Sequence, residues 1–312
     1  MIKSNVPLAL CRRARRFRRF AFVAFVIGLS VAAADAPPAA RADDVVLGAQ
    51  HLRIDSGNGF CALNRNDSTE LAVLHFFEDM YRGKSQLLAY WGDCASLARF
   101  RNGASDDISP YVTVLGLLQG GRATSTNLRR PEFIRQMVDA LARNEHLQDV
   151  LTESVPEMQQ RFDDALGNLA IDPQFHLKIG EVKSVGLLRQ DDHALYFGIL
   201  AHTDMNGQDS IIAGVVATTQ LKGLAVTTNV YADYADPRTF DALSAQAQAI
   251  TDRLITDNDD LVETVPISWS SGLSDRIANG VGHAAAYVIL GAIAAGIAGL
   301  WRAAKRRFTR QS

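Results

Sequence analysis

The sequence predicts an α+β protein in which an antiparallel sheet is sandwiched between helices, with a membrane-targeting segment at each end. Three observations predict this arrangement. The chain begins with a basic cluster and an apolar run, its second half contains four consecutive strand-like segments joined by short turns, and near its end an uncharged apolar run is followed by cations. Strands grouped together between helical segments are typical of the α+β class.

The N-terminal segment has the order of a secretory signal. Six arginines lie between positions 12 and 19, and an apolar run of about fifteen residues follows, Phe20–Ala34. An A-x-A pattern ends at Ala42, so we predict cleavage between Ala42 and Asp43, with residues 1–42 as the signal peptide. An uncleaved anchor is the alternative, although a bilayer span needs about 20 residues. Because two adjacent arginines directly precede the run, general secretion and twin-arginine export both stay open.

The first half of the predicted external domain, residues 43–258, mixes strands and helices. Its clearest local signal is a capping box, Asp67 to Glu70, in which an N-cap acceptor precedes a glutamate by three residues. The helix that follows has apolar residues at helical spacing and ends at Gly83, a residue type common at C-caps. Around this helix the sequence predicts further elements: strands over Val45–Ile54, Ser85–Trp91 and Tyr111–Leu118, a turn over Ser56–Gly59, and a short helix over Asp93–Arg101.

The second half is predicted to be helical at first and then to form a four-stranded meander. Helices are expected after Pro131, because proline favours the first helical turn, and over Val155–Ala170. Asn206 and Gly207 form the strongest hairpin signal in the chain, and the other links are as short, so neighbouring strands must be antiparallel. The expected strands are Phe175–Leu188, Ala194–Thr203, Ser210–Thr219 and Gly223–Tyr231.

A last helix and a linker follow the meander. Asp236 and Pro237 have the residue types that favour the N-cap and the first helical position, and an apolar stripe continues to about Asp257. Residues 259–280 are polar and mixed in composition. We predict that they link the external domain to the membrane.

The second apolar run predicts one transmembrane helix, residues 281–301. About 20 residues at 1.5 Å each cross a bilayer core. Cations crowd the tail, residues 302–312, and positive charge marks the cytoplasmic side of a span. The prediction is therefore a single-pass protein of the bacterial inner membrane, with its bulk in the periplasm and its C-terminus in the cytoplasm. Gly291, Ala295 and Gly299 recur every four residues, which favours lateral association of helices; a plain Ala/Gly-rich span is the alternative.

Two of the three cysteines, Cys61 and Cys94, lie in the predicted external domain. An oxidising compartment and an even count predict a disulfide between them. In the chain-entropy description, closing this loop stabilises the fold by about 3–4 kcal/mol. A redox-active pair is the sharper alternative, but the spacing differs from C-x-x-C.

Charge is distributed unevenly along the chain. Between Asp43 and Trp301 the sequence has 19 basic and 33 acidic residues, a net charge of −14. So acidic a domain is poorly suited to nucleic acid or anionic lipid, which are polyanions. We therefore predict no nucleic-acid partner. An acidic surface could attract cations or basic proteins, or serve solubility alone.

Two loops resemble ligand-binding motifs but lack an essential part. The glycines that precede Arg122 are not followed by the lysine and hydroxyl residue that a phosphate loop needs, so a glycine turn is the better interpretation. The segment Asp204–Asp209 has its glycine at the fourth position, whereas an EF-hand loop has it at the sixth. A hairpin turn explains that segment better.

The titratable residues form no complete site either. His193 and His202 differ by nine positions, so on one strand they project to opposite faces of the sheet. Asp233 and Asp236 could be an acid/base pair, but a turn residue and a helix N-cap explain them better. We assign no catalytic residue, no cofactor and no metal ligand from the sequence.

Two short stretches carry a family resemblance. Gly59-Phe60-Cys61-Ala62-Leu63 after a first strand, and Asn229-Val230-Tyr231-Ala232-Asp233-Tyr234 before a last helix, resemble exported bacterial proteins with a PsbP-like α-β-α domain. The resemblance spans roughly Val45 to Asn258. It implies a sheet between helical layers and, because such domains are mostly assembly or accessory factors, a role without catalysis.

The functional prediction rests on architecture, acidity and the lack of a complete motif. We predict a membrane-anchored periplasmic protein with a non-catalytic interaction or envelope-assembly role and a protein partner in the envelope. One alternative is a periplasmic hydrolase-type enzyme whose residues meet only in the fold. Another is a domain that binds small ligands or cations.

Overall fold

The computed structural model describes residues 43–57, 59–105, 108–143, 147–169, 177–205 and 207–259. The predicted signal peptide, the transmembrane helix, the tail and nearly all of the linker lie outside these residues. The same holds for Ala42 at the predicted cleavage site and for the ridge of Gly291, Ala295 and Gly299. Within the described part, no helix is both long and apolar enough to cross a bilayer. The described residues therefore lie almost entirely within the predicted external domain, residues 43–258.

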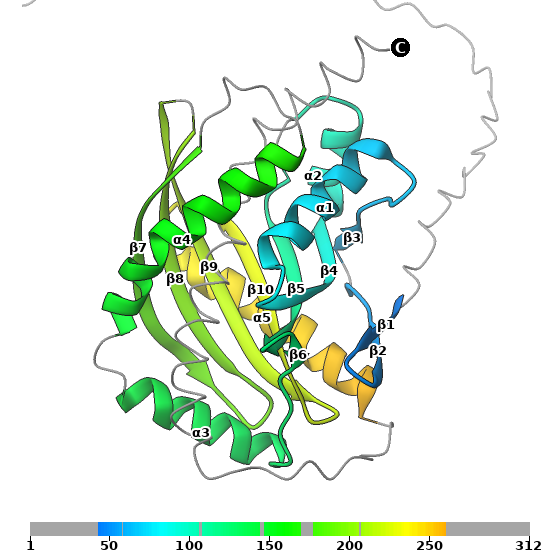
Figure 1. The fold of residues 1–312 in the computed structure, drawn as a ribbon, viewed down its shortest axis with the longest axis vertical. Coiled ribbons are helices and arrows are strands. Elements are labelled where there is room, and N and C mark those ends of the chain that lie inside the picture. Colours follow the sequence, from blue (N-terminus) through cyan, green and yellow to red (C-terminus); the bar gives the residue numbers. More distant parts are fainter. Residues whose placement is uncertain are drawn as a thin grey trace, which may run out of the picture. The chain divides into compact units, whose positions relative to one another are not determined.

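One antiparallel sheet forms the centre of this domain, and the mixed α+β prediction is confirmed (Figure 1). Neighbouring strands lie in the order β3-β4-β5-β10-β9-β8-β7. The last four strands form the predicted meander, and β10 closes the sheet by pairing with β5, with Tyr231 opposite Tyr111. The strands are β3 (Phe60–Ala62), β4 (Ser85–Asp93), β5 (Tyr111–Gln119), β7 (Leu177–Gln190), β8 (Leu195–Met205), β9 (Gln208–Leu221) and β10 (Leu224–Asp233), and the short β6 (Arg122–Ala123) pairs with the end of β5.

The first predicted strand, Val45–Ile54, is wrong: this segment is a hairpin of two strands, β1 (Asp43–Leu47) and β2 (Gln50–Ile54). Gly48 turns the chain with a φ of 60°, a conformation that costs glycine little. The sequence carries only this one glycine as a turn signal within an apolar stretch. Leu47 of the hairpin packs closely against Gly116 of β5, where a Cβ would lie 2.4 Å from it. A side chain at Gly116 would therefore push the hairpin away.

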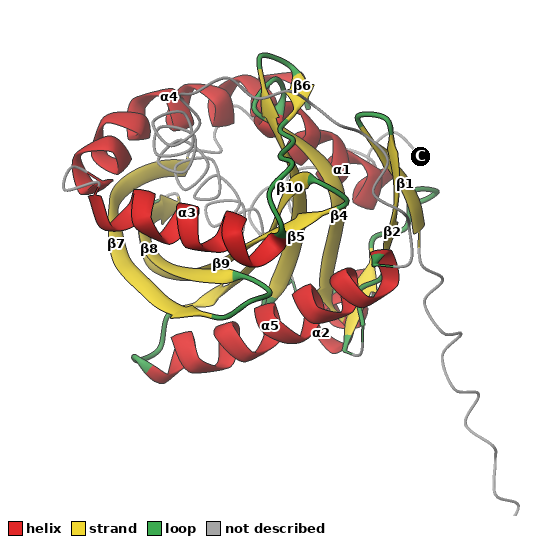
Figure 2. Ribbon diagram, turned by 90° about the horizontal axis from the view of Figure 1, so that it is seen from below, coloured by secondary structure: helices red, strands yellow, loops and turns green. Residues whose placement is uncertain are grey.

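Helices cover both faces of the sheet (Figure 2). On one face, α5 (Arg238–Asn258) packs with the β1–β2 hairpin on an apolar cluster that includes Val215 and Val226. The other face carries a second cluster, beneath the helices α1 (Ser68–Tyr81), α3 (Arg130–Arg143) and α4 (Leu147–Asn168). The short helix α2 (Cys94–Arg101) lies beside β3 and β4. Each face thus has its own core.

The helix starts follow the sequence signals with two adjustments. The Asp67 carboxylate caps α1 by accepting hydrogen bonds from the backbone N–H groups of Thr69 and Glu70, both at 2.9 Å. Helix α4 begins at Leu147, eight residues before the predicted start, because buried Leu147 and Leu151 extend its apolar face. Helix α5 begins at Arg238, so Pro237 and not the predicted Asp236 is its N-cap; Asp236 lies one residue before the cap, where its carboxylate accepts from the backbone N–H of Arg238 at 2.8 Å.

The predicted disulfide is confirmed. Cys61 on β3 and Cys94 at the start of α2 are bonded, with an S–S distance of 1.99 Å. β3 is only three residues long and is an edge strand. The disulfide therefore fastens this short edge strand to the helix beside it.

Candidate functional site

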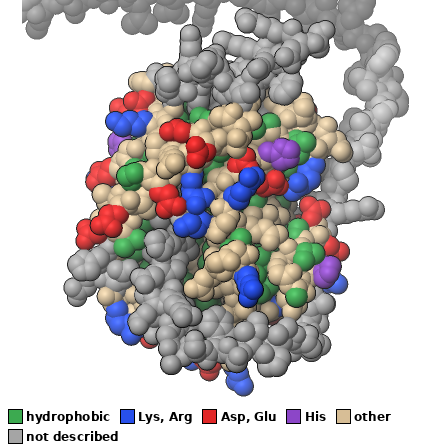
Figure 3. Space-filling model, in the orientation of Figure 1, with side chains coloured by type: hydrophobic (Ala, Val, Ile, Leu, Met, Phe, Trp, Pro, Cys, Tyr) green, Lys and Arg blue, Asp and Glu red, His purple; other side chains and the backbone are tan. Residues whose placement is uncertain are grey.

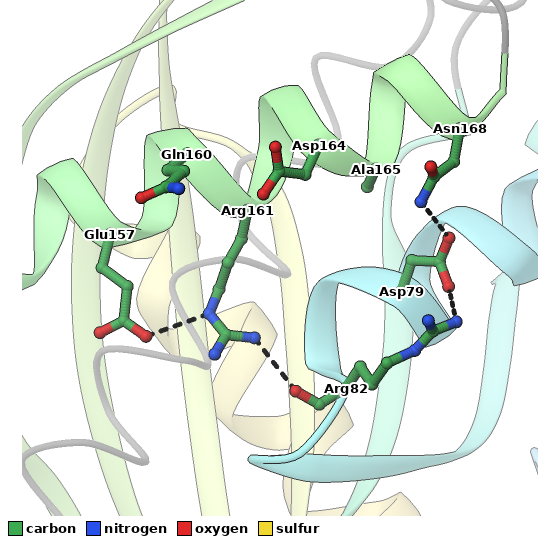
Figure 4. Close-up of a pocket in the computed structure, with 8 residues that line it drawn as sticks. All are labelled: Asp79, Arg82, Glu157, Gln160, Arg161, Asp164, Ala165 and Asn168. Atoms are coloured by element: carbon green, nitrogen blue, oxygen red, sulfur yellow. Dashed lines mark hydrogen bonds and ion pairs between the residues drawn. The ribbon is translucent and has the colours of Figure 1, made fainter.

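A polar groove lies between α4 and the C-terminal end of α1 (Figure 4). Its volume is about 400 Å³, and it is open to solvent on one side. Three carboxylates and two guanidinium groups share the groove with two carboxamides. The lining residues are Asp79, Arg82, Glu157, Gln160, Arg161, Asp164, Ala165 and Asn168.

Arg161 joins the two helices that form the groove. Its guanidinium donates to the Glu157 carboxylate at 3.1 Å and to the backbone carbonyl oxygen of Arg82 at 3.1 Å. α1 has no basic residue in its own last turn. Since cations stabilise the carbonyl end of a helix, Arg161 supplies to α1 the positive charge that its own sequence lacks.

The second ion pair of the groove is also internal. The Arg82 guanidinium donates to the Asp79 carboxylate, which accepts a further hydrogen bond from the Asn168 side-chain amide at 3.0 Å. Both arginines of the groove are thus engaged with groups of the protein itself. Asp164 adds a third carboxylate to this lining.

The solvent-exposed face of α4 extends the acidic character of the groove. Its exposed or half-buried carboxylates outnumber its single arginine five to one. In Figure 3, acidic side chains gather on the part of this face where α4 lies, around a few basic ones. Like charges four residues apart repel by about 0.2–0.5 kcal/mol a pair. The five are Asp149, Glu153, Glu157, Asp163 and Asp164; with Asp79 they are named here the α4 acidic face.

Two glutamines of α4 close the free edge of the sheet. The Gln159 amide donates to the carbonyl oxygen of Leu177 at 2.9 Å and accepts from the N–H of Ile179 at 2.8 Å. Three helical turns away, Gln148 does the same with the carbonyl of Val182, at 2.7 Å, and the N–H of Ser184, at 2.9 Å. Each amide takes the place of a peptide group from a further strand. This part of β7 is therefore blocked against strand addition.

The edge of the β1–β2 hairpin is closed in the same way. The Asn258 side-chain amide donates to the carbonyl oxygen of Arg53 at 2.8 Å and accepts from its N–H at 2.9 Å. Beyond Ser184, β7 also contains register shifts, one of them at Gly186 with a φ of 96°. Bulges and amide caps both protect sheet edges, so near β7 and the hairpin the helical surfaces are better candidates for binding than the strand edges.

The two buried carboxylates among the described residues are parts of structural ion pairs. Glu70 accepts from the Arg101 guanidinium at 2.7 and 2.9 Å, and this hydrogen bond raises the pKa of Arg101. Asp55 accepts from Arg253 at 2.6 Å. Glu70 ties α1 to α2, and Asp55 ties the end of β2 to α5. Both carboxylates therefore hold elements together.

A row of stacked tyrosines crosses the sheet beneath α1. Tyr90 stacks on Tyr111 with ring centroids 5.5 Å apart, and Tyr111 stacks on Tyr231 at 5.0 Å. Burial raises the pKa of Tyr231 and of nearby Tyr81, which keeps both hydroxyls neutral. The Tyr81 hydroxyl is fully buried, and the nearby Thr113 side chain lowers its pKa against the larger effect of burial. This row belongs to the core.

The histidines and aspartates weighed from the sequence do not meet in one site. His193 Nδ1 lies 2.8 Å from an oxygen of Asp252 on α5, and both side chains are well exposed. His202 is exposed on β8, nine residues from His193 and so about 30 Å away at strand spacing. Asp236 pairs with Arg238, which lowers its pKa, whereas partial desolvation raises the pKa of Asp233 at the otherwise exposed end of β10.

The two loops weighed as ligand motifs are turns. Gly120 and Gly121 turn the chain from β5 to β6 with φ values of 58° and 75°. The Asp204 carboxylate accepts from the backbone N–H of Gly207 at 2.7 Å and so closes the β8–β9 turn. Among the described residues there is no cluster of three or more His, Cys, Asp or Glu arranged to hold a metal ion.

A scan against models of known protein families and a search of curated proteins both gave no match. The features that bear on function are the groove, the α4 acidic face and the closed edges of β7 and of the β1–β2 hairpin.

Proposed function

We propose that this chain is a membrane-tethered accessory protein of the bacterial envelope, and that its external domain binds a partner protein through the α4 acidic face. The observation that carries the proposal is the groove of about 400 Å³ between α1 and α4, with carboxylates along it. The partner is expected to present a basic segment. The domain acts by binding, and the groove is its docking site.

The charge balance of the groove supports a cationic partner. Arg161 and Arg82 are each held by a carboxylate of the groove and cannot offset the remaining acids without breaking those bonds. The like-charged series on α4 is a small cost to the free domain. A basic segment would relieve that repulsion, and complementary charge also speeds encounter and selects the partner.

The closed edges support a helical docking surface over strand addition. Where a sheet edge is open, an incoming peptide can add as a strand. Here Gln148 and Gln159 occupy the backbone groups of β7 that such a peptide would use. The groove is formed by the same helix, so α4 both closes the sheet and presents the docking surface.

The tether part of the proposal rests on the sequence. The predicted signal peptide, residues 1–42, sends the domain out of the cytoplasm, and the predicted span, residues 281–301, keeps it at the inner membrane. The acidic domain suits a basic protein partner in the periplasm better than it suits nucleic acid.

Site-specific photo-crosslinking in cells tests the proposal. A photoreactive residue replaces Gln160, which lines the groove and is exposed, and a matched control carries it at Ala249 on the exposed side of α5. We expect an adduct with an envelope protein from position 160 only, lost when Glu153 and Asp163 are changed to lysine. Equal adducts from both positions, or an adduct that survives the charge reversal, would contradict a docking site on α4.

A further inference from the structure

The two ends of the described domain leave it from the same corner. Asp43, the first residue of β1, pairs with Ile54 of β2. The neighbouring residue Arg53 is bound through its backbone to the side chain of Asn258, the last residue of α5, at 2.8 and 2.9 Å. Whatever precedes the domain and whatever follows it therefore attach within about one or two strand spacings, each about 4.8 Å.

Three further segments meet the chain ends at this corner. The Arg130 guanidinium donates to Asp259 at 2.7 Å and to the backbone carbonyl of Gln220 at 3.0 Å. The Lys222 ammonium, in the β9–β10 turn, donates to the carbonyl of His51. A Cβ at Gly48 would touch that of Ala123 on β6, at 3.2 Å. We name this region the tether corner: residues 43–54, 122–132, 220–223 and 258–259.

Cations concentrate at the tether corner. It holds five basic residues, Arg53, Arg122, Arg129, Arg130 and Lys222, against four acidic ones, Asp43, Asp44, Glu132 and Asp259, a net charge of +1. The rest of residues 43–259 has 13 basic and 26 acidic residues, a net charge of −13. The corner is therefore close to neutral, whereas the rest of the domain taken together is strongly acidic.

We infer that the tether corner rests on the anionic phospholipid headgroups of the membrane that holds the chain, an inference that rests on the proposed membrane tether. Residues 260–280 span at most about 70–75 Å when extended, so their length alone would allow any face to approach the bilayer. The charge of each face therefore determines which face lies against the bilayer. The field of an anionic surface falls off within a Debye length of about 10 Å, and so it acts on whichever end lies nearest.

This orientation holds the docking surface away from the lipid. Strand β9 runs from Gln208 to Leu221, so the β8–β9 turn lies about 40 Å from the β9–β10 turn at the tether corner (Figure 1). Helix α4 packs along β7, the outer strand of the same meander. With the corner on the membrane, a partner could reach the α4 acidic face from the periplasm.

Fluorescence quenching in vesicles measures the orientation directly. The full chain, with Cys11→Ser so that the native disulfide holds the only other cysteines, is reconstituted in phosphatidylglycerol-containing vesicles. A fluorophore is attached through Asn127→Cys at the corner or Gln208→Cys at the far turn, both exposed positions. Headgroup-attached quencher is expected to quench the label at position 127 strongly and the label at 208 weakly, and added salt is expected to remove the difference.

Charge reversal separates electrostatic contact from chance proximity. Arg122→Glu with Arg129→Glu is expected to shift the contact equilibrium by at least about fivefold for each reversed residue, since a basic residue at an anionic surface contributes about 1 kcal/mol and the acid that replaces it is repelled. Arg65→Glu with Arg99→Glu makes the same charge change away from the corner and should leave the quenching unaltered. Pure phosphatidylcholine vesicles should abolish the preference for position 127.

Two results would overturn the inference. One is equal quenching at positions 127 and 208, and the other is no quenching at 127 while the chain stays in the vesicles after an alkaline wash. Loss of the chain in that wash is a separate readout: it would refute the membrane tether itself, and the orientation would fall with it.

Discussion

The guanidinium of Arg161 on α4 donates a hydrogen bond to the backbone carbonyl oxygen of Arg82, the C-cap residue of α1, with 3.1 Å between the two atoms. The same group reaches the Glu157 carboxylate. Arg161→Met keeps an unbranched apolar stem and removes both interactions. We expect the free energy of unfolding to fall by about 1–2 kcal/mol, because the C-terminal carbonyl groups of α1 lose a cationic partner and a charge-assisted hydrogen bond.

Urea unfolding followed by circular dichroism would measure the loss. Arg161→Lys keeps the charge but not the fork of donors, so it should retain part of the stability. Arg135→Met on the exposed side of α3 is the control for the removal of one arginine. An Arg161→Met variant as stable as the parent would show that the contact between α4 and α1 contributes nothing measurable to the free energy of unfolding.

The amide caps on β7 predict an association phenotype. Gln148→Leu with Gln159→Leu removes two donors and two acceptors from the edge and leaves backbone groups of β7 without partners. Open edges pair with other chains, so the variant should form concentration-dependent dimers or larger species. Size-exclusion chromatography with light scattering detects them. Gln160→Leu adds apolar surface to α4 without touching the edge, and it should keep the association state of the parent.

The sequence predicts the elements whose signals are local. The meander follows from alternating residues and the Asn206-Gly207 turn, and the disulfide follows from two cysteines in a domain that the sequence predicts to be exported. The β1–β2 hairpin was missed because Gly48 lies in a run that also fits one longer strand. The positive φ of Gly48 is what distinguishes the hairpin from one longer strand.

The groove and the edge caps could not be predicted from the chain alone. Gln148, Gln159 and Gln160 are all glutamines of α4, yet only the first two bind the backbone of β7. Their eleven-residue spacing is three helical turns, which would have placed them on one side of α4. What that side faces depends on the packing of α4 against a strand that follows it in the chain. Arg161 likewise acts on a helix some eighty residues earlier.

Removal of the disulfide should destabilise the edge at β3. Cys61→Ala with Cys94→Ala opens a loop of 33 residues, and we expect a loss of about 3–4 kcal/mol in the free energy of unfolding. Thermal unfolding of the parent in reductant should approach that of the variant, and the variant itself should not respond to reductant. A double variant as stable as the parent would mean that β3 is held by its pairing with β4 alone.

Asp233 and Asp236 should affect stability with opposite signs as pH changes. The folded-state pKa of Asp236 is lowered by Arg238, so its contribution is present above the ordinary carboxylate pKa and is lost as pH falls through the lowered value. The folded-state pKa of Asp233 is raised by desolvation, so its ionised form opposes folding, and stability should rise as pH falls through the ordinary and raised values.

Melting temperatures of two isosteric variants, measured from neutral to acid pH, would test this pair. Asp236→Asn should lower the melting temperature at neutral pH, because the ion pair with Arg238 is lost, and the difference should shrink as acid protonates the parent. Asp233→Asn should raise the melting temperature at neutral pH, because a desolvated charge is removed, and that difference should also vanish in acid. Shifts of the same sign would refute the opposite environments of the two carboxylates, and with them the view that Asp236 is stabilised by its ion pair with Arg238 while Asp233 bears a desolvation penalty at the end of β10.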